Sequence, residues 1–532
     1  MKLDSVAVLG GGPGGLYAAR LLKLAHPRAN VAVYEQSPPE ATFGFGVALA
    51  GRTQRNLDAA DPVTQADILA AGLPHDMQML VDGRGARVHN SALIGIARTE
   101  LLAVLRRHAD AAGVELHYGD RARLADLSAD LVVVADGVSS QTRADLAEEL
   151  GATVETAGCL YLWAGADFAL DTAIFAPVTT EHGTFVTHAY PYAADRSTFL
   201  IETDEATWRG AGFDASTDNT PVDQSDTAAL AYLQDAFAEH LDGHRLIGNR
   251  TRWTRFRTVH CDRWTRGNVV LIGDAAHTAH YSVGSGTKLA MEDAIALCDA
   301  VTAADDLSTA LASYEQARRP QVERLQELAR RSRLWWDSFP RRLHLPVDQL
   351  MVAYMTRTGN VGLQRLADSN PEIVTGALAQ LSHTAPADIP TDDVVAWSLA
   401  QPLRRGEHTS ACRTLSPEQR DALTAPAEPG PPPSAGTLAL AEVDLADPWG
   451  CAADALVKQL LDLAGSGWAG FWLTGPPDRA AVLTRLAVGE RLRTDTGAVV
   501  AVDGPAPYLD DLAAGIVSGR ADLVCLVPVT AA

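Results

Sequence analysis

Cysteine is scarce in this chain: the 532 residues include six, and they are widely separated. No two of them form a C-x-x-C pair, so the spacing of a zinc site or a redox pair is missing and we expect no metal. Scattered cysteines are typical of proteins in the reducing cytoplasm. The sequence also has no apolar run of the roughly 18–20 residues that cross a membrane. We therefore expect a cytoplasmic protein that makes no membrane contact.

Positive charge is in deficit as well. The chain has 44 lysines and arginines against 66 aspartates and glutamates, which gives a formal net charge of -22 at pH 7. This balance excludes nucleic acid and anionic membranes as general partners, because both repel an acidic surface. The excess of acids also serves solubility. The length is sufficient for two to four domains.

Glycine is plentiful at the N-terminus, where its positions form a pattern. An apolar segment at residues 6–9 predicts a strand, and Gly10, Gly12 and Gly15 follow it as G-x-G-x-x-G before an expected helix. A second strand-like segment ends at Glu35. Such glycines permit a tight turn, approach of a pyrophosphate and close helix packing, and an acid about 20 residues on can bind a ribose hydroxyl. The pattern predicts a Rossmann-like dinucleotide site.

Two later segments repeat the order of strand, acid and glycine. The apolar residues 131–134 precede Asp136-Gly137, and the apolar residues 269–272 precede Gly273-Asp274. Closely spaced glycines then open another expected helix near residue 286. Backbone N–H groups at a helix N-terminus attract a phosphate or an electron-rich ring. We expect the last motif to return the chain to the sheet of the nucleotide-binding domain.

The remaining sequence indicates an α/β fold with several parts. Alternating strand and helix signals at 1–150 and 262–345 predict one nucleotide-binding domain with a parallel sheet. Turn-separated strands at 151–261 predict an antiparallel-sheet substrate domain. Pro320 is expected to kink a long helix at 307–337 or to divide it. The rest is expected to be a helical segment at 346–424, a Pro-rich linker at 425–436 and a small α/β unit at 437–532.

The three motifs, in this order, resemble those of the single-component FAD-dependent aromatic hydroxylases, the para-hydroxybenzoate hydroxylase-like monooxygenases, over roughly residues 1–375. The resemblance implies that the nucleotide-binding domain holds FAD, which NADH or NADPH reduces. It implies hydroxylation of an aromatic ring with O2 through a C4a-hydroperoxyflavin. The cofactor would supply the difficult chemistry, which accounts for the absence of a Ser-His-Asp set and of a second convincing dinucleotide motif in the sequence.

The resemblance also assigns residues. The positions that it implies for cofactor binding are Gly10, Gly12, Pro13, Gly14, Gly15, Glu35, Gln36, Val47, Arg98, Asp136, Gly137, Asp274, Gly284, Ser285, Gly286, Thr287 and Lys288. Two of these have alternatives: Arg98 as a surface arginine at a helix start, and Asp136 as the cap of an Asp-Gly turn.

Departures from the family pattern narrow the resemblance. His280-Tyr281 stands where the family usually has two prolines, and Lys288 stands where it usually has asparagine. At both positions the sequence resembles the subgroup that contains salicylyl-CoA 5-hydroxylases and 2-aminobenzoyl-CoA monooxygenases. Salicylyl-CoA 5-hydroxylation is the reaction we expect, with 2-aminobenzoyl-CoA or a free indole or polyketide aromatic as alternative substrates. His280 and Tyr281 are the candidate catalytic residues, expected to line the space beside the flavin, with His280 acting either as an acid or base or by packing against the ring.

A CoA thioester requires cations. Four arginines alternate along an expected strand, which would place them on one face, and three more lie on the long helix. They are suited to hold phosphates, and the alternative is that they form ion pairs with the abundant acids. The residues are Arg250, Arg252, Arg255, Arg257, Arg330, Arg331 and Arg333.

The C-terminal part has a second resemblance. Residues 515–526 are similar to the last strand of an old yellow enzyme-type barrel, which some members of the subgroup carry. The part after the linker is far shorter than the roughly 250 residues of a complete eight-fold barrel. Pro528 stands where that family has an arginine for the FMN phosphate. We expect a shortened, non-catalytic remnant.

Overall fold

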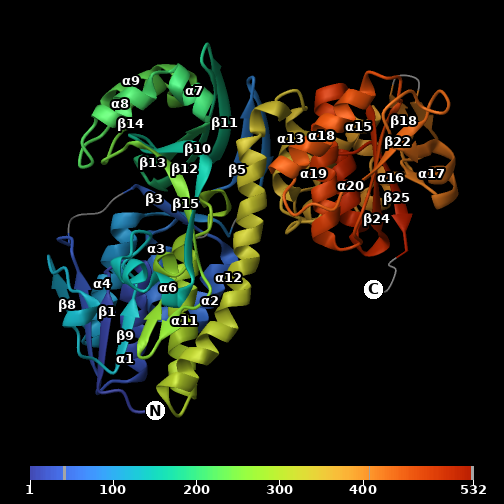
Figure 1. Cartoon of the computed structure of the whole chain (residues 1–532). Helices are drawn as coiled ribbons and strands as arrows, with labels where there is room; N and C mark the ends of the chain where they lie inside the picture. Colours follow the sequence, from blue (N-terminus) through green and yellow to red (C-terminus); the bar gives the residue numbers. More distant parts are fainter. Residues whose placement is uncertain (40–43, 91, 285, 406–407, 529–532) are drawn as a thin grey trace. The chain divides into compact units, whose positions relative to one another are not determined.

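A computed structural model describes residues 1–39, 44–90, 92–284, 286–405 and 408–528 (Figure 1). The chain divides into two compact units. Unit 1 comprises Met1–Met77 and Asn90–Asp337, and unit 2 comprises Gln78–His89 and Ser338–Ala532. The sequence prediction assigns 78–89 and 338–345 to the nucleotide-binding domain, whereas the structure groups both segments with unit 2. The long helix that belongs to unit 1 ends at Asp337.

A six-stranded sheet, in the order β16-β17-β9-β1-β2-β8, forms the centre of unit 1. All its pairings are parallel except that between β16 and β17. Its central strands are runs of buried valine, leucine and alanine, as expected for a sheet that is covered on both faces. The strands are β1 (Ser5–Leu9), β2 (Asn30–Glu35), β8 (Glu115–Tyr118), β9 (Leu131–Val134), β16 (Thr265–Arg266) and β17 (Val269–Leu271).

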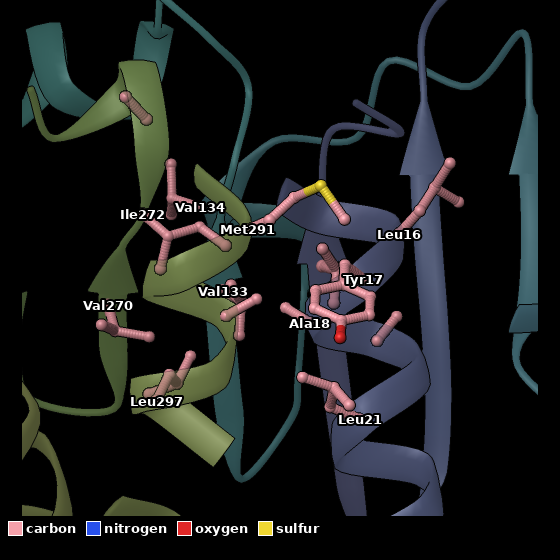
Figure 2. Close-up of a cluster of buried hydrophobic side chains, with 14 of the residues drawn as sticks. Leu16, Tyr17, Ala18, Leu21, Val133, Val134, Val270, Ile272, Met291 and Leu297 are labelled. Carbon is pink, nitrogen blue, oxygen red and sulfur yellow. The ribbon is translucent and has the colours of Figure 1, made fainter. Parts of the chain in front are cut away.

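Two helices from distant parts of the sequence pack side by side on this sheet. Figure 2 shows side chains of α1 (Pro13–Ala25) and α11 (Gly286–Ala303) meeting those of β9 and β17 in one buried cluster. A Cβ on Gly14 would lie 2.9 Å from the Cβ of Ala290, so glycine permits the close approach of the two helices. This contact brings the first and the last glycine motif together.

Helix α12 (Leu307–Asp337) continues through Pro320 as one helix. Of the two outcomes expected at Pro320, a kink or a division into two helices, the division is therefore wrong. Buried residues on both sides of the proline, Tyr314 and Val322 among them, hold the two halves against unit 1. Their packing offsets the cost of the hydrogen bond that proline removes.

The antiparallel sheet predicted after residue 150 is confirmed, in the order β14-β10-β13-β12-β11 with β15 also paired to β10. Its strands are β10 (Ala152–Ala166), β11 (Ala173–Thr180), β12 (Gly183–Ala193), β13 (Arg196–Thr203), β14 (Leu246–Ile247) and β15 (Trp253–Cys261). A three-stranded sheet contains β3 (Gly46–Leu49), β4 (Leu73–Pro74) and β7 (Ile94–Ala97). The other helices of unit 1 are α2 (Gly51–Ala60), α3 (Pro62–Ala71), α4 (Arg98–Ala112), α5 (Gln141–Asp145), α6 (Ala147–Leu150), α7 (Glu205–Gly210), α8 (Phe213–Asn219), α9 (Thr227–Ala236) and α10 (Ala238–Leu241).

Unit 2 contains a sheet in which every pairing is parallel, in the order β20-β25-β24-β23-β22-β21. From β21 to β25 the strands follow one another in sequence, as successive strands do in a β/α barrel. They are β20 (Thr414–Leu415), β21 (Thr424–Pro426), β22 (Leu438–Glu442), β23 (Gly470–Thr474), β24 (Val499–Pro505) and β25 (Leu523–Val527). Two shorter strands, β18 (Leu403–Arg405) and β19 (His408–Ser410), pair with each other, while β5 (Met77–Val81) and β6 (Arg84–Val88) lie in or next to 78–89.

The helices of unit 2 are α13 (Val347–Thr356), α14 (Leu363–Ser369), α15 (Pro371–Ser382), α16 (Val394–Ala400), α17 (Pro417–Leu423), α18 (Cys451–Ala464), α19 (Arg479–Thr496) and α20 (Leu509–Val517). Strands β20 and β21 come from the end of the predicted helical segment and the start of the predicted linker. Proline is accepted in β21 because this strand is at the edge of the sheet. The Trp468 indole donates to the Gly430 carbonyl at 2.9 Å, which anchors the Pro-rich stretch. Among the described residues, no helix is both long and apolar enough to cross a membrane.

Leu297 on α11 tests the packing in Figure 2. It is fully buried, so Leu297→Ala is expected to lower the free energy of unfolding by about 2–5 kcal/mol, measured by urea titration. Leu24→Ala on α1 is the control, because this side chain is half exposed and its loss should cost less than about 0.5 kcal/mol. Equal effects of the two variants would contradict this account of the core.

Candidate active site

The three predicted motifs meet at one edge of the parallel sheet. Leu9 of β1 pairs with Val134 of β9, and Val134 pairs with Leu271 of β17, so the three strands end at the same level. The residues that follow these ends lie in the crevice outside the carboxyl ends of the strands, which is where open α/β sheets bind ligands. They are Gly10, Asp136 and Asp274.

The N-terminal glycines have different tasks. Gly10 has a φ of +104°, and a Cβ there would lie 2.3 Å from the Ala135 carbonyl oxygen. A Cβ on Gly15 would lie 2.1 Å from the Gly10 carbonyl oxygen. Gly12, in contrast, faces open space, with no atom within 4 Å of its Cβ position. It precedes Pro13 at the start of α1, where no side chain caps the helix, so backbone N–H groups are left for an anion.

Glu35 joins the ends of the first two strands. Its Oε2 accepts a hydrogen bond from the Gly11 N–H at 2.8 Å, and its Oε1 accepts one from the Ser37 N–H at 2.8 Å. Each oxygen retains a lone pair for a ligand hydroxyl. Gln36, which follows, is exposed.

Asp136 presents an unused acceptor. Its Oδ1 is buried without a hydrogen-bond partner in the described structure. Burial raises the pKa of Asp136, while hydrogen bonds with Ser140 and Thr142 oppose the shift. Asp136 therefore caps its turn, which is one of the two interpretations given from the sequence. Its Oδ1 also remains available to a ligand. Gly137 has a φ of +83° and no atom within 4 Å of its Cβ position.

Asp274 and Arg98 interact through their opposite charges. Burial raises the pKa of Asp274, and the electrostatic interactions with His277 and Arg98 oppose that rise. Burial lowers the pKa of Arg98, and the charge of Asp274 opposes it. Arg98 opens α4, where its N–H donates to the Phe45 carbonyl at 2.8 Å. The Arg98 side chain is half-buried rather than on the open surface.

The last predicted motif opens α11. Gly284 is exposed, with a φ of +59° and no atom within 4 Å of its Cβ position. Gly286, Thr287 and Lys288 form the first turn of α11, and the Gly286 Cβ position lies 3.9 Å from Asp274 Oδ1. Ser285 lies outside the described residues. Val47 is buried in β3, opposite Ile96 of β7.

A buried ionic network beneath the Asp274 loop was missed from the sequence. Asp293 of α11 accepts the Gly273 N–H at 2.9 Å and lies 2.8 Å from His277 Nε2, while Arg318 Nε donates to it at 2.9 Å. Burial alone raises the pKa of Asp293, but His277 and Arg318 more than offset this, so its pKa lies below the usual value. The sequence does contain one indication of this network, which is an acidic residue on the apolar face of a helix.

Tyr281 and His280 occupy different surroundings. The Tyr281 hydroxyl donates to Glu202 Oε2 on β13 at 2.6 Å. Burial and the charge of Glu202 raise the Tyr281 pKa well above its usual value, so the hydroxyl keeps its proton. His280 is buried, with Nδ1 2.9 Å from Ser282 Oγ and its ring packed between Phe256 and Tyr281.

Glu202 belongs to an acidic cluster that the sequence reading also missed. His188 Nε2 lies 3.3 Å from Glu202 Oε1, and both side chains are buried. Burial, together with the charge of Glu202, raises the pKa of Asp337 to about 6, and the Cys159 thiol hydrogen-bonds this carboxyl. Two carboxyl groups and one tyrosine are the components of an acid–base site. The indication of this cluster in the sequence is Glu202 itself, an acid in a run of buried strand residues.

The arginines considered for CoA binding are engaged within unit 1. Ion pairs link Arg255 to Glu205, Arg330 and Arg331 to Glu327, and Arg333 to Glu155. Two others hydrogen-bond to neutral groups: Arg252 donates to the Thr217 carbonyl and Arg257 to the Ser139 hydroxyl. Of the alternating arginines, Arg255 and Arg257 lie in β15, whereas Arg250 and Arg252 precede it.

The comparisons with known proteins agree with this geometry. A family model described as FAD binding domain matches residues 97–329. Salicyloyl-CoA 5-hydroxylase from a Streptomyces species is 38% identical over 531 residues, covering 98% of this chain and 99% of the relative. The chain belongs to the FAD-dependent aromatic monooxygenases. The family inferred from the three motifs is confirmed, and with it the FAD cofactor.

Other monooxygenases match a smaller part of the chain. The 3-hydroxy-4-methyl-anthranilyl-(aryl-carrier protein) 5-monooxygenase of Streptosporangium sibiricum is 40% identical over 366 residues, covering 68% of this chain and 96% of the relative. A solved structure of 2-methyl-3-hydroxypyridine-5-carboxylic acid oxygenase aligns with a TM-score of 0.53 at 20% identity, covering 67% of this chain and 96% of that one. The similarity to this solved structure shows that the two proteins share a fold.

The crevice fits the FAD of this monooxygenase family. Gly12 leaves space for a pyrophosphate at the uncapped start of α1, and the buried Asp136 Oδ1 lacks a donor that a ligand hydroxyl can provide. We propose that these residues, with Glu35, Arg98 and Asp274, hold the cofactor. Among the described residues no group of three or more His, Cys, Asp or Glu side chains is arranged to hold a metal ion.

Two glycine variants test this crevice. Gly12→Ala meets no protein atom, so we expect its thermal stability without cofactor to stay unchanged while FAD affinity falls about tenfold or more, because the methyl group enters the space left for the pyrophosphate. Gly15→Ala collides with the Gly10 carbonyl and should lose both stability and FAD. Fluorescence titration with FAD and thermal melts measure the two effects. Unchanged FAD affinity of Gly12→Ala would refute the placement of the pyrophosphate beside Gly12.

Asp337 makes stability depend on pH. Its pKa is raised from 3.8 to about 6 in the folded protein, so the folded state binds its proton more tightly than the unfolded chain, and stability falls as pH rises through this range. Asp337→Asn removes the cost of ionising this carboxyl in the folded protein. We expect its melting temperature, relative to the parent, to be higher at pH 8 than at pH 5. The exposed Asp58 on α2 provides the control variant Asp58→Asn, and a pH-independent difference for Asp337→Asn would contradict the assignment.

Proposed function

We propose that this monooxygenase hydroxylates the aromatic ring of an aryl-CoA thioester, with salicyloyl-CoA 5-hydroxylation as the favoured reaction. One observation carries the proposal. The similarity to the Streptomyces salicyloyl-CoA 5-hydroxylase runs through both units, over 98% of this chain. The carrier-protein monooxygenase, in contrast, leaves about a third of the chain without a counterpart.

A 2-aminobenzoyl thioester is the second candidate substrate. The relative named for an anthranilyl ring is 40% identical where it aligns, a value similar to that of the salicyloyl-CoA relative. A hydroxyl and an amino group both donate electrons to the para carbon of the ring. Position 5 is therefore the expected site of oxygen transfer for either substrate.

The protein's own residues would position and polarise this ring. When bound, FAD supplies the electrons of NADH or NADPH and the activation of oxygen. Tyr281 keeps its proton and donates a hydrogen bond to Glu202, so the Tyr281 oxygen is left to accept a hydrogen bond from the ring hydroxyl or amino group. That interaction would increase electron donation into the ring. His280, packed against Tyr281, would fix the orientation of the tyrosine.

A substrate panel tests the proposed function. The FAD-loaded protein is incubated with NADH, O2 and one of four compounds: salicyloyl-CoA, 2-aminobenzoyl-CoA, or either free acid. We expect the salicyloyl thioester to gain one oxygen atom at least tenfold faster than the free acid, as measured by mass spectrometry. Equal rates for salicylate and its thioester would rule out the CoA assignment, and formation of peroxide with no oxygenated product would rule out hydroxylation of this panel.

A further inference from the structure

Unit 2 contains a cavity of about 350 Å³ that the proposed function does not use. Apolar side chains, among them Leu345, Leu381 and Ile516, form part of its lining. Arg405 of β18 and Arg493 of α19 also line it. The volume falls within the range of about 300–1,000 Å³ that is typical of small-molecule sites, and such sites combine apolar walls with a few polar groups.

Three guanidinium groups share one acid beside this cavity. Arg493 Nε and Arg405 Nη1 donate to Asp522 Oδ1 at 2.9 and 3.2 Å. Arg413 Nη1 donates to the Asp522 carbonyl at 3.1 Å. Asp522 is fully buried, and so is Arg413 apart from 5% of its surface. With one carboxylate against three cations, this cluster has an excess of positive charge.

The excess charge is costly to the folded protein. Burial lowers the pKa of Arg405 and of Arg413, and repulsion among the three guanidinium groups contributes to both shifts. Arg413 Nε is also buried without a hydrogen-bond partner in the described structure. Partly buried cations that lack counter-charges are stabilised by a bound anion, and guanidinium groups bind phosphate in particular. This cluster is cationic although the chain as a whole carries a net charge of -22.

We propose that the cavity binds the phosphorylated adenosine of CoA, an inference that rests on the proposed function. Arg405 and Arg493 would bind a phosphate, and the apolar wall would contact the adenine. A carrier-protein thioester has no free adenosine nucleotide. In agreement with this difference, the carrier-protein relative leaves about a third of this chain unmatched, whereas the CoA relative matches both units.

Calorimetry on the FAD-loaded full-length protein tests the ligand. The probes are CoA, 3′-dephospho-CoA, NADPH and inorganic phosphate, because CoA and NADPH both carry a phosphorylated adenosine. We expect CoA to bind at least about tenfold more tightly than 3′-dephospho-CoA, since a charge-assisted phosphate contact is lost. Binding of NADPH as tight as that of CoA, with the same dependence on Arg405, would overturn the assignment to CoA. So would equal binding of CoA and 3′-dephospho-CoA.

Two variants locate the site. Thr494→Glu adds a negative charge at an exposed position of the lining while leaving the arginine cluster intact, and Arg405→Gln removes one cation. We expect each to weaken CoA binding about tenfold and to raise KM for the aryl-CoA substrate by a similar factor, with a smaller change in kcat. Arg405→Lys should restore part of the affinity. Lys458→Gln, an exposed charge change on α18 that is not part of the lining, should leave CoA binding within twofold.

The outcomes separate this inference from the proposed function. If the aryl-CoA substrate is preferred but Thr494→Glu and Arg405→Gln both bind CoA within twofold of the parent, the proposed function stands and the cavity assignment fails. If the free acid reacts as fast as its thioester, the proposed function fails. Loss of CoA affinity in both variants, with unchanged melting temperature for Thr494→Glu, supports the cavity assignment.

Discussion

The candidate site depends on the buried carboxylate of Asp293. This group receives the Gly273 N–H, contacts His277 and binds Arg318. It therefore joins the loop after β17, helix α11 and helix α12. Breaking a buried ion pair on one side leaves an uncompensated charge, which is strongly destabilising. The same carboxylate thus anchors the loop that carries Asp274 to the two helices α11 and α12.

The sequence was sufficient to predict the local features of the crevice. Gly10, Gly12 and Gly15 follow a strand, and their spacing has one common structural explanation. The meeting of Asp136 and Asp274 could also be anticipated, because neighbouring parallel strands end at one edge. Asp293 and Glu202 were missed for a physical reason. Their partners His277 and Tyr281 lie 16 and 79 residues away along the chain, and a single sequence does not show which buried polar groups pair.

Unit 2 shows a second limit of sequence reasoning. Strands β20 and β21 have two and three residues, too few for an alternating pattern to be recognised. They join the sheet through long-range parallel pairing instead. The arginines of residues 250–333 illustrate the same limit for charge. Their clustering in the sequence suggested an anion site, yet most of them are occupied by partners inside unit 1, whereas Arg405, Arg413 and Arg493, far apart in sequence, gather around Asp522.

The hydrogen bond from Tyr281 to Glu202 has a consequence for evolution. It connects the loop before α11 to strand β13 of the antiparallel sheet, and the acid at its end is buried. A phenylalanine at position 281 would leave Oε2 of that carboxylate without its donor, at a cost of about 1–3 kcal/mol or more. The two positions are therefore constrained to covary: homologues that lose the phenol should also have replaced the acid, so the loop before α11 and the antiparallel sheet of this monooxygenase cannot diversify independently.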